Sequence, residues 1–390
     1  MKTDFDTIMD RTGPSFLKWG YASKVFNDTG VLPMWVADMD FKAPPAVIDA
    51  LKKHAEHGDF GYCVRPDSFY EAVIAWVRSR HNWNITRDWM LFCPGGVSAL
   101  NLSVMSFSSP GDKVIVQTPV YYPFLMAIKN NDRELLCNKL LFKDGRYAMD
   151  FNDLETHMAA GAKLLILCSP HNPVGRVWRR EELVSLAELC KKYHVVLVSD
   201  EIHSDLVYTD HKHVPVASLS EQLLHSTVTI MAPSKTFNLA GLSTCSVIIP
   251  GSKLRNLFFR SIMMTGIDMT NTFGIPAFEA AYRHGAEWLH QLLMYLEDNL
   301  TFLLNFFKEK IPEIVPVKPE GTYLVWLDCS SLALPPHELK SFFIKKAKVG
   351  LDDGAKFGPG GDAFQRINIA CPRSILEEGL KRIERALRDV

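Results

Sequence analysis

The sequence lacks any hydrophobic run long enough to cross a membrane. Its longest apolar stretches, residues 164–168 (LLILC) and 195–199 (VVLVS), have the length of buried strands, whereas a bilayer needs roughly 20 apolar residues. The opening residues are polar and acidic, without a basic stretch followed by an apolar one, so we expect no signal peptide. These absences predict a protein without a membrane partner.

Closely spaced cysteines and a charge bias are also missing. The eight cysteines are scattered and none form a C-x-x-C pair, which predicts free thiols in the reducing cytoplasm. Lys and Arg number 43 against 44 Asp and Glu, a formal net charge of −1, so nothing suggests a nucleic-acid partner. We therefore expect a cytoplasmic protein whose partners are small molecules or other proteins.

What the sequence does contain is an alternation of short apolar runs with amphipathic stretches. The apolar runs lie at residues 89–93, 112–117, 163–170, 195–200, 227–234 and 243–250. Strands that alternate with helices predict an α/β fold with a mostly parallel sheet covered by helices. Beyond about residue 286, a long helical stretch leads to a shorter α+β-like region. We predict a large domain over 46–285 and a small domain formed by 1–45 and 286–390.

Polar motifs follow three of the predicted strands. HNPVGR (171–176) comes after one strand, DEIH (200–203) after the next, and PSKTFNLAG (233–241) after a third. In a doubly wound sheet these turns open onto one edge, beyond the carboxyl ends of the strands, where ligands bind. The sequence therefore predicts a ligand site at that edge.

These motifs, in this order and spacing, resemble a known family. WVADMDF (35–41), HGDFGY (57–62), SPHNPVGRVW (169–178), SDEIHSDL (199–206), APSKTFNLAGL (232–242) and the late GPGG and RINIACP stretches are similar to fold-type I enzymes that use pyridoxal 5′-phosphate (PLP). The chain resembles the class I/II aminotransferase superfamily and, within it, the branch of cystathionine β-lyases and related C–S lyases. That resemblance implies a sheet of the seven-stranded type in the large domain, PLP as cofactor, and an amino acid as substrate.

The resemblance also implies roles for the residues at the strand ends. Lys235 would hold PLP as an imine and later move a proton at the substrate Cα. Asp200 would keep the cofactor's ring nitrogen protonated, and Asn172 would donate to its phenolic oxygen and contact the substrate. His203 occupies a place where many aminotransferases have a tyrosine near the same oxygen, with a structural histidine as the alternative.

Other residues match the family's phosphate and substrate contacts. Gly95, Gly96 and Val97, between a strand and a helix, suit a phosphate because backbone N–H groups at a helix start bind anions. Ser234, beside the lysine, would add a hydroxyl. Arg366, in QRINIA, would bind the substrate carboxylate.

Two tyrosines complete the predicted site. Tyr121, in PVYYPF, resembles the catalytic aromatic that stacks on the cofactor ring, with neighbouring Tyr122 as the alternative. Tyr62 resembles the tyrosine that reaches the phosphate and the substrate in the neighbouring subunit. The resemblance therefore implies a homodimer with active sites at the subunit interface.

The sequence favours a lyase over a transaminase, and it argues against a metal. Ser243 stands where many aminotransferases have an arginine that binds the cofactor phosphate, eight residues after the lysine. His211 and His213 form an H-x-H pair without a third ligand, so we predict no metal site. The Met-rich stretch 261–271 is interpreted as core or site lining.

The predicted reaction is an α,β-elimination. L-cystathionine, a related cysteine S-conjugate or L-cysteine would give a thiol (homocysteine or hydrogen sulfide), pyruvate and ammonia. A place in methionine biosynthesis is expected. An aminotransferase of amino acids is the first alternative, and a PLP-binding regulatory protein is the second.

Overall fold

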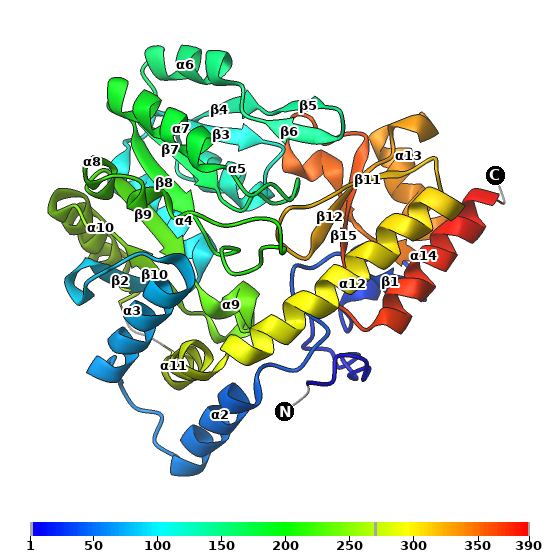
Figure 1. Cartoon of the computed structure of the whole chain (residues 1–390), viewed down its shortest axis with the longest axis horizontal. Coiled ribbons are helices and arrows are strands. Elements are labelled where there is room, and N and C mark those ends of the chain that lie inside the picture. Colours follow the sequence, from blue (N-terminus) through cyan, green and yellow to red (C-terminus); the bar gives the residue numbers. More distant parts are fainter. Residues whose placement is uncertain (1–2, 269–270, 389–390) are drawn as a thin grey trace.

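The computed structural model describes residues 3–268 and 271–388, and a seven-stranded sheet lies at its centre (Figure 1). The strand order is β2-β10-β9-β8-β7-β3-β4. Strand β10 runs antiparallel to both of its neighbours, while β9, β8, β7, β3 and β4 run parallel. The strands are β2 (Met90–Cys93), β3 (Lys113–Thr118), β4 (Glu134–Lys139), β7 (Leu164–Cys168), β8 (Val196–Asp200), β9 (Thr227–Met231) and β10 (Cys245–Ile248).

Strand β7 shows why the sheet is covered on both faces. Its five residues are all buried and apolar, and successive side chains point to opposite faces. Leu164 and Ile166 pack in one apolar cluster, and Leu165 and Leu167 in another. The first cluster draws on α4 (Gly96–Phe107), α5 (Tyr122–Lys129) and α10 (Ser252–Thr265), the second on α6 (Phe151–Ala159) and α7 (Arg180–Lys192).

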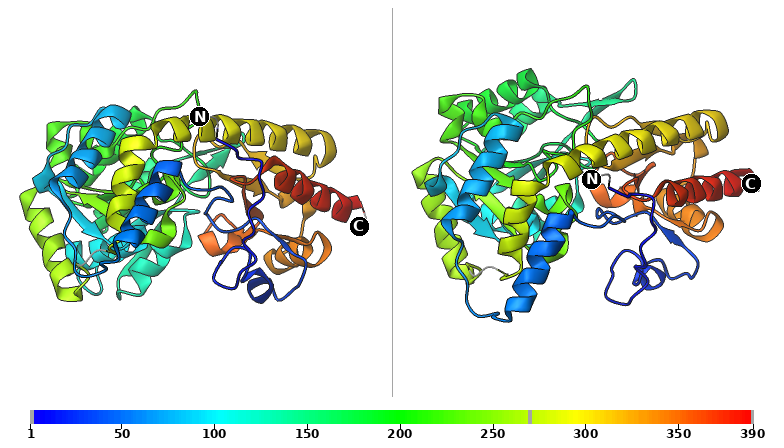
Figure 2. Two further views of the ribbon diagram at one scale, coloured as in Figure 1. Left: turned by 90° about the horizontal axis from the view of Figure 1, so that it is seen from below. Right: turned by 60° about the horizontal axis from the view of Figure 1, so that its bottom comes forward.

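A smaller antiparallel sheet lies to one side of the large one, in the order β11-β12-β15-β14. The 25-residue helix α12 (Ala286–Lys310) runs from the large sheet's helices to this smaller sheet and lies along α14 (Arg373–Arg388) (Figure 1). The N-terminal segment joins the same part of the molecule (Figure 2). Its strand β1 (Leu32–Pro33) pairs in parallel with β13 (Val349–Gly350).

The remaining elements complete the fold. The strands are β5 (Leu141–Lys143), β6 (Arg146–Ala148), β11 (Val315–Val317), β12 (Leu324–Asp328), β14 (Asp352–Asp353) and β15 (Phe364–Asn368). The helices are α1 (Ala22–Phe26), α2 (Pro45–His57), α3 (Asp67–His81), α8 (Glu221–Leu224), α9 (Pro233–Thr236), α11 (Gly274–His284) and α13 (Pro336–Ser341).

The predicted α/β class with a mostly parallel sheet is confirmed. Each of the six predicted apolar runs matches a strand of the large sheet to within one residue at its C-terminal end or contains it, and the seventh strand, β4, was missed because it is only half-buried and carries polar residues at both ends. The domain boundaries at 45/46 and 285/286 stay a prediction. Within the described ranges, no helix combines the length and the apolar character that a membrane span needs.

Candidate active site

Lys235 lies at the edge of the large sheet, on the short helix α9 that begins two residues after β9 ends. Its amine donates a hydrogen bond of 2.7 Å to the carbonyl oxygen of Ala37. Removal from water lowers the pKa of Lys235 to about 8, and the nearby positive charge of Arg366 acts in the same direction. The amine is therefore far closer to its reactive, unprotonated form at neutral pH than an ordinary lysine.

Asp200 ends β8, the strand next to β9. Its carboxylate accepts a hydrogen bond of 3.2 Å from the Ile202 N–H. Burial raises the pKa of Asp200 to about 7, although that hydrogen bond and the charge of Lys235 oppose the rise. A cation placed beside this carboxylate would keep it ionised, because opposite charge favours the charged form.

Arg366 and Asn172 meet beside these two groups. The Arg366 Nη1 donates to the Asn172 Oδ1 at 2.9 Å, while its Nη2 donates to the Trp35 carbonyl (2.9 Å) and to the Asp352 carboxylate (2.6 Å). Arg366 is 1% exposed, and its Nε finds no hydrogen-bond partner among the described residues. A buried guanidinium with an unused donor is suited to a carboxylate ligand.

His203, three residues after β8, and Tyr323, just before β12 of the smaller sheet, lie against each other with ring centroids 6.2 Å apart. Burial, reinforced by the charges of Lys235 and Arg366, holds the pKa of His203 well below its ordinary value, so the ring stays neutral. Its Nδ1 has no partner within the described part of the chain. The Tyr323 hydroxyl donates to the same Ala37 carbonyl as Lys235, at 2.9 Å.

The glycine turn at residues 95–97 opens helix α4, as predicted. Gly95 has a φ of 102°, a conformation that favours glycine, and Gly96 begins the helix. The first N–H groups of a helix have no partner within it, so they are available to an anion. Val97 is exposed and Ser234 is half-buried.

The two tyrosines of the PVYYPF turn lie together, with ring centroids 5.1 Å apart. Tyr121 directly precedes α5, and burial raises its pKa to about 12, so the hydroxyl stays protonated. The Tyr121 N–H donates to the carbonyl of Asn172 at 3.0 Å, which places Tyr121 at the same edge of the sheet. Its role as the stacking residue stays a prediction.

Tyr62 is not buried in the site of its own chain, because its side chain is 95% exposed. Its neighbours Phe60 and Val64 are also exposed, at 56% and 87%. The loop between α2 and α3 thus presents apolar and aromatic surface to the outside. Contact with a neighbouring subunit stays a prediction.

Four contributors to the site were not predicted from the sequence. They are the carbonyl groups of Trp35 and Ala37, the carboxylate of Asp352 and the hydroxyl of Tyr323. Residues 35–41 were expected to match a family motif, and no contact with the site was predicted for them. The identity of a side chain does not show which main-chain carbonyl will face a site. Asp352 and Tyr323 are side-chain contributors, but they reach the site only through the long-range packing of the fold.

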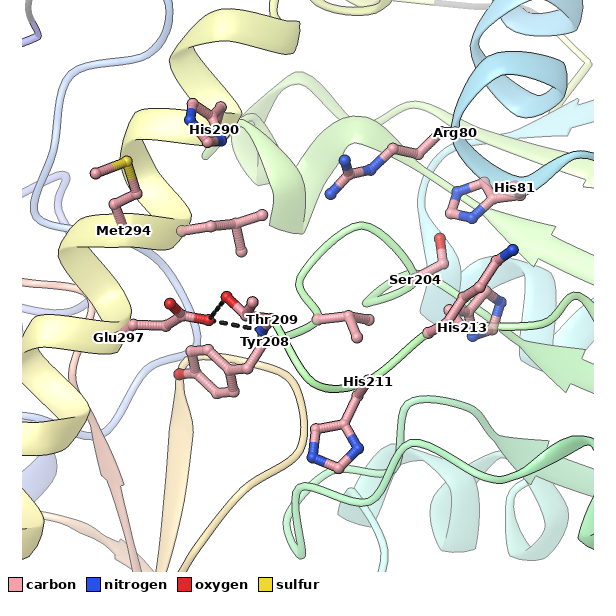
Figure 3. A pocket seen from close by; sticks show the side chains of 13 residues that line it. Arg80, His81, Ser204, Tyr208, Thr209, His211, His213, His290, Met294 and Glu297 are labelled. Carbon is pink, nitrogen blue, oxygen red and sulfur yellow. Dashed lines mark hydrogen bonds between the residues drawn. The ribbon is translucent and has the colours of Figure 1, made fainter.

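The H-x-H histidines lie at a separate pocket of about 280 Å³, between α3, the loop after β8, and α12 (Figure 3). The His213 Nε2 lies 2.8 Å from Glu201, and the His81 Nε2 lies 3.0 Å from Asp205. His211 lies further out on the same loop (Figure 3). No group of three His, Cys, Asp or Glu side chains in the described ranges is arranged to hold a metal ion.

Asp205 connects this pocket to the lysine turn. Its carboxylate accepts hydrogen bonds from the Trp76 Nε1 (3.2 Å) and from the hydroxyl of Thr236 (2.9 Å), the residue after Lys235. Burial alone would raise the pKa of Asp205, but the hydrogen bond and charge of His81 hold it below its ordinary value. A buried, ionised carboxylate therefore anchors the turn from behind.

The structure also describes Ser243 and most of the Met-rich stretch at residues 261–271. Ser243 takes a left-handed conformation (φ 48°) at the end of a short 3-10 helix. In the Met-rich stretch, Ile262 is buried, while Met263 and Met264 are 52% and 75% exposed, so these two methionines do not belong to the core. Met269 and Thr270 lie outside the described residues.

Comparison with known proteins gives the family of this site. The family model described as aminotransferase class I and II matches residues 29–383. This chain belongs to that family. Within the family it is similar to the cystathionine beta-lyase PatB of Bacillus subtilis, with 46% identity over 98% of this chain and 100% of that protein.

Solved structures of family members have the same fold. Cystalysin from Treponema denticola, which contains PLP, matches with a TM-score of 0.96 and 40% identity over 100% of both chains. The PLP-bound C–S lyase from Staphylococcus hominis matches with a TM-score of 0.92 and 33% identity, over 99% of this chain and 98% of that one.

The residues present in this chain fit PLP. An amine with a lowered pKa, a buried carboxylate and a helix start with free N–H groups occupy one edge of the sheet. PLP has an aldehyde, a ring nitrogen and a phosphate for these three groups respectively. The unpartnered His203 Nδ1 and Arg366 Nε are further buried polar atoms that a bound molecule would satisfy.

Proposed function

We propose that the protein is a PLP-dependent C–S lyase. Its substrates are L-cystathionine and related cysteine S-conjugates or L-cysteine, and its products are a thiol, pyruvate and ammonia. The observation that carries the proposal is a lysine with a lowered pKa near a buried arginine that has an unused donor, two groups suited to an amino acid bound to PLP. The Lys235 amine has a pKa of about 8, and Arg366 is close enough to contribute to that shift.

Each functional group of the cofactor would have a partner in the chain. Lys235 would hold it covalently, and Asp200 would face the ring nitrogen as an ionised carboxylate. The start of α4 at Gly95–Val97, with Ser234, would hold the phosphate. Asn172 would donate its amide N–H to the phenolic oxygen while its Oδ1 remains bonded to Arg366.

Bound PLP supplies an electron sink that stabilises negative charge at the substrate Cα. Arg366 binds the substrate carboxylate and orients the amino acid, and it contributes the unused Nε–H to that contact. The amine of Lys235 removes the proton from Cα, which its lowered pKa favours. Tyr121 and neutral His203 lie at the same edge of the sheet, and the side chain of the substrate would depart beside them as a thiolate.

The relatives support the choice of reaction. The related proteins named above are called cystathionine beta-lyase and C–S lyase. An aminotransferase would use the same lysine and aspartate, so geometry at these two residues does not separate the alternatives. A PLP-binding regulator would need no intact catalytic set, whereas this chain retains Lys235, Asp200, Asn172 and Arg366 together.

We also propose a homodimer, a cytoplasmic location and a role in methionine biosynthesis. Tyr62 and its exposed apolar neighbours support the dimer, since they offer a surface for a second subunit to which Tyr62 would contribute. None of the eight cysteines forms a disulfide bond in the part of the chain that the structure describes, as expected in a reducing compartment. Cleavage of cystathionine would release homocysteine, the direct precursor of methionine. This product supports the assignment to methionine biosynthesis.

The test is an incubation of the purified, PLP-loaded protein with L-cystathionine and no 2-oxo acid, following pyruvate. Steady release over many turnovers is expected. Absence of pyruvate, together with turnover that depends on a 2-oxo acid acceptor, would make the protein an aminotransferase. Binding of PLP without either reaction would leave the regulatory alternative.

A further inference from the structure

The segment at residues 35–41 lies between the lysine and the arginine of the site. The Trp35 carbonyl accepts from Arg366 at 2.9 Å, and the Ala37 carbonyl accepts from Lys235 at 2.7 Å. Two carbonyl groups, two residues apart on one strip of backbone, therefore contact both functional cations. Any shift of this segment changes the surroundings of both.

The segment has no regular secondary structure, so its main-chain groups need other partners. Two asparagine side chains supply several of them, and Arg11 donates a further hydrogen bond of 3.1 Å to the Met39 carbonyl. The Asn238 Nδ2 donates to the carbonyls of Met39 (2.9 Å) and Phe41 (3.0 Å), and its Oδ1 accepts from the Met39 N–H (3.0 Å). One amide group thus makes three hydrogen bonds to the C-terminal half of the segment.

Asn368 does the same for the N-terminal half. Its Nδ2 donates to the carbonyls of Val36 and Asp38, both at 2.6 Å, and its Oδ1 accepts from the Ala370 N–H at 2.7 Å. The side chain is fully buried. Because a buried carbonyl without a donor is costly, these hydrogen bonds strongly favour this position of the segment.

The two asparagines stand on the elements that carry the functional residues. Asn238 is three residues after Lys235, on the turn that follows α9, and Asn368 is two residues after Arg366, on β15. Each one therefore ties the segment to the element that carries one of the two cations. A third attachment lies further along, where Asp40 accepts from the Lys18 amine (2.7 Å) and the Trp19 Nε1 (2.8 Å).

We propose that Asn238 and Asn368 are positioning residues, which fix the segment so that Ala37 places the lysine amine and Trp35 places the arginine. The inference rests on the proposed function and deepens it. Asn238 acts mainly on the proton transfer by Lys235, because both residues belong to the turn at α9. Asn368 acts mainly on carboxylate binding by Arg366, because it is tied to that strand.

The test compares Asn238→Ala and Asn368→Ala with the wild type as PLP-loaded proteins. Amide hydrogen exchange of residues 36–41 is expected to rise about tenfold in both variants, since local opening becomes easier. With L-cystathionine, N238A should lose about tenfold in kcat at nearly unchanged KM, and N368A should raise KM about tenfold at nearly unchanged kcat.

A buried asparagine elsewhere provides the matched control. The Asn138 Nδ2 donates to the Asp150 carbonyl on β4's side of the sheet, away from the segment. Asn138→Ala should change neither the exchange of residues 36–41 nor the two kinetic constants. If N368A proves unable to fold, Asn368→Asp replaces it, because the carboxylate keeps the acceptor for Ala370 and loses both donors to the segment.

Exchange of residues 36–41 that is unchanged in both variants would overturn the proposal, as would an equal fall in kcat with the same KM in both. These results are separable from the proposed function. A wild type that releases no pyruvate contradicts the lyase assignment, whereas the exchange measurement still decides whether the asparagines hold the segment.

Discussion

The side-chain amine of Lys235 and the carbonyl oxygen of Ala37 are 2.7 Å apart, although 198 positions separate the two residues in the sequence. The large sheet supplies the lysine, and the N-terminal segment supplies its acceptor. The reactivity of the lysine is thus decided by parts of the chain that meet only in the folded protein.

The first prediction concerns the pH at which the unloaded protein captures PLP. Only the unprotonated amine reacts, so the rate should rise with pH and level off above about 8, the pKa of Lys235. Stopped-flow absorbance measures this rate. Since the charge of Arg366 lowers that pKa, Arg366→Gln should move the midpoint upward. A wild-type midpoint near the ordinary lysine pKa would contradict the description of the site.

Loss of the lysine itself should remove turnover. Lys235→Ala is expected to lower kcat at least about 10³-fold, because the group that moves the Cα proton is gone. Added ethylamine should restore part of the rate by acting as the missing base. Lys192→Ala, which removes an exposed lysine paired with Glu155, serves as control and should be fully active. Turnover of K235A close to that of wild type would refute the proposed role.

A third prediction concerns the carboxylate site. Arg366→Lys keeps the charge and loses the planar fork, so KM for L-cystathionine should rise about 10–100-fold. Asp352→Asn should raise KM less, because it weakens the orientation of the arginine and leaves the guanidinium in place. Steady-state kinetics with both variants measures these KM values. Equal KM values in R366K and wild type would exclude binding of the substrate carboxylate by Arg366.

Asp205 should contribute to stability in a pH-dependent way. Asp205→Ala leaves Trp76, His81 and Thr236 without their acceptor, and we expect a loss of about 3 kcal/mol in the free energy of unfolding. Because its pKa is lowered in the folded state, this contribution is present above the unfolded pKa near 3.9 and is lost as the pH falls through the folded pKa.

Urea denaturation at pH 7 and at progressively lower pH measures this difference. The gap between wild type and Asp205→Ala should narrow in acid. Asp88→Ala removes an exposed carboxylate and should leave stability within about 0.5 kcal/mol of wild type. A gap for Asp205→Ala that widens below pH 4 would show that the sign of the effect is wrong.

The last prediction addresses the shared site. If Tyr62 serves the neighbouring subunit, Tyr62→Ala and Lys235→Ala are each nearly inactive alone. After unfolding and refolding together, half of the dimers are mixed and each has one intact site, so about a quarter of wild-type activity should return. No recovery in a mixture shown to contain mixed dimers would place Tyr62 outside the neighbour's site.

The sequence predicted the fold class because apolar strands and amphipathic helices alternate clearly along residues 89–250. Because the carboxyl ends of parallel strands meet at one edge, it also predicted that the turns carrying Asn172, Asp200 and Lys235 would lie together. Arg366, on β15 of the smaller sheet, was expected at the site only through the family resemblance. The sequence could not predict which backbone carbonyls those residues would contact. The Ala37 carbonyl, the Asp352 carboxylate and the Tyr323 hydroxyl reach the site through long-range packing, which no local pattern records.

Helix α12 has a consequence for the kind of molecule that the site accepts. Trp288, near its start, packs on Phe237, two residues after the lysine, and Asn299 donates to the Ile369 carbonyl, three residues after the arginine. These two attachments are separated by 11 residues of one continuous helix, or about 16 Å. The helix therefore links the turn that carries Lys235 rigidly to the strand that carries Arg366. All α-amino acids have the same short distance from amine to carboxylate, so a rigid link between the elements that carry the lysine and the arginine suits this constant part and leaves substrate choice to the residues around the side chain.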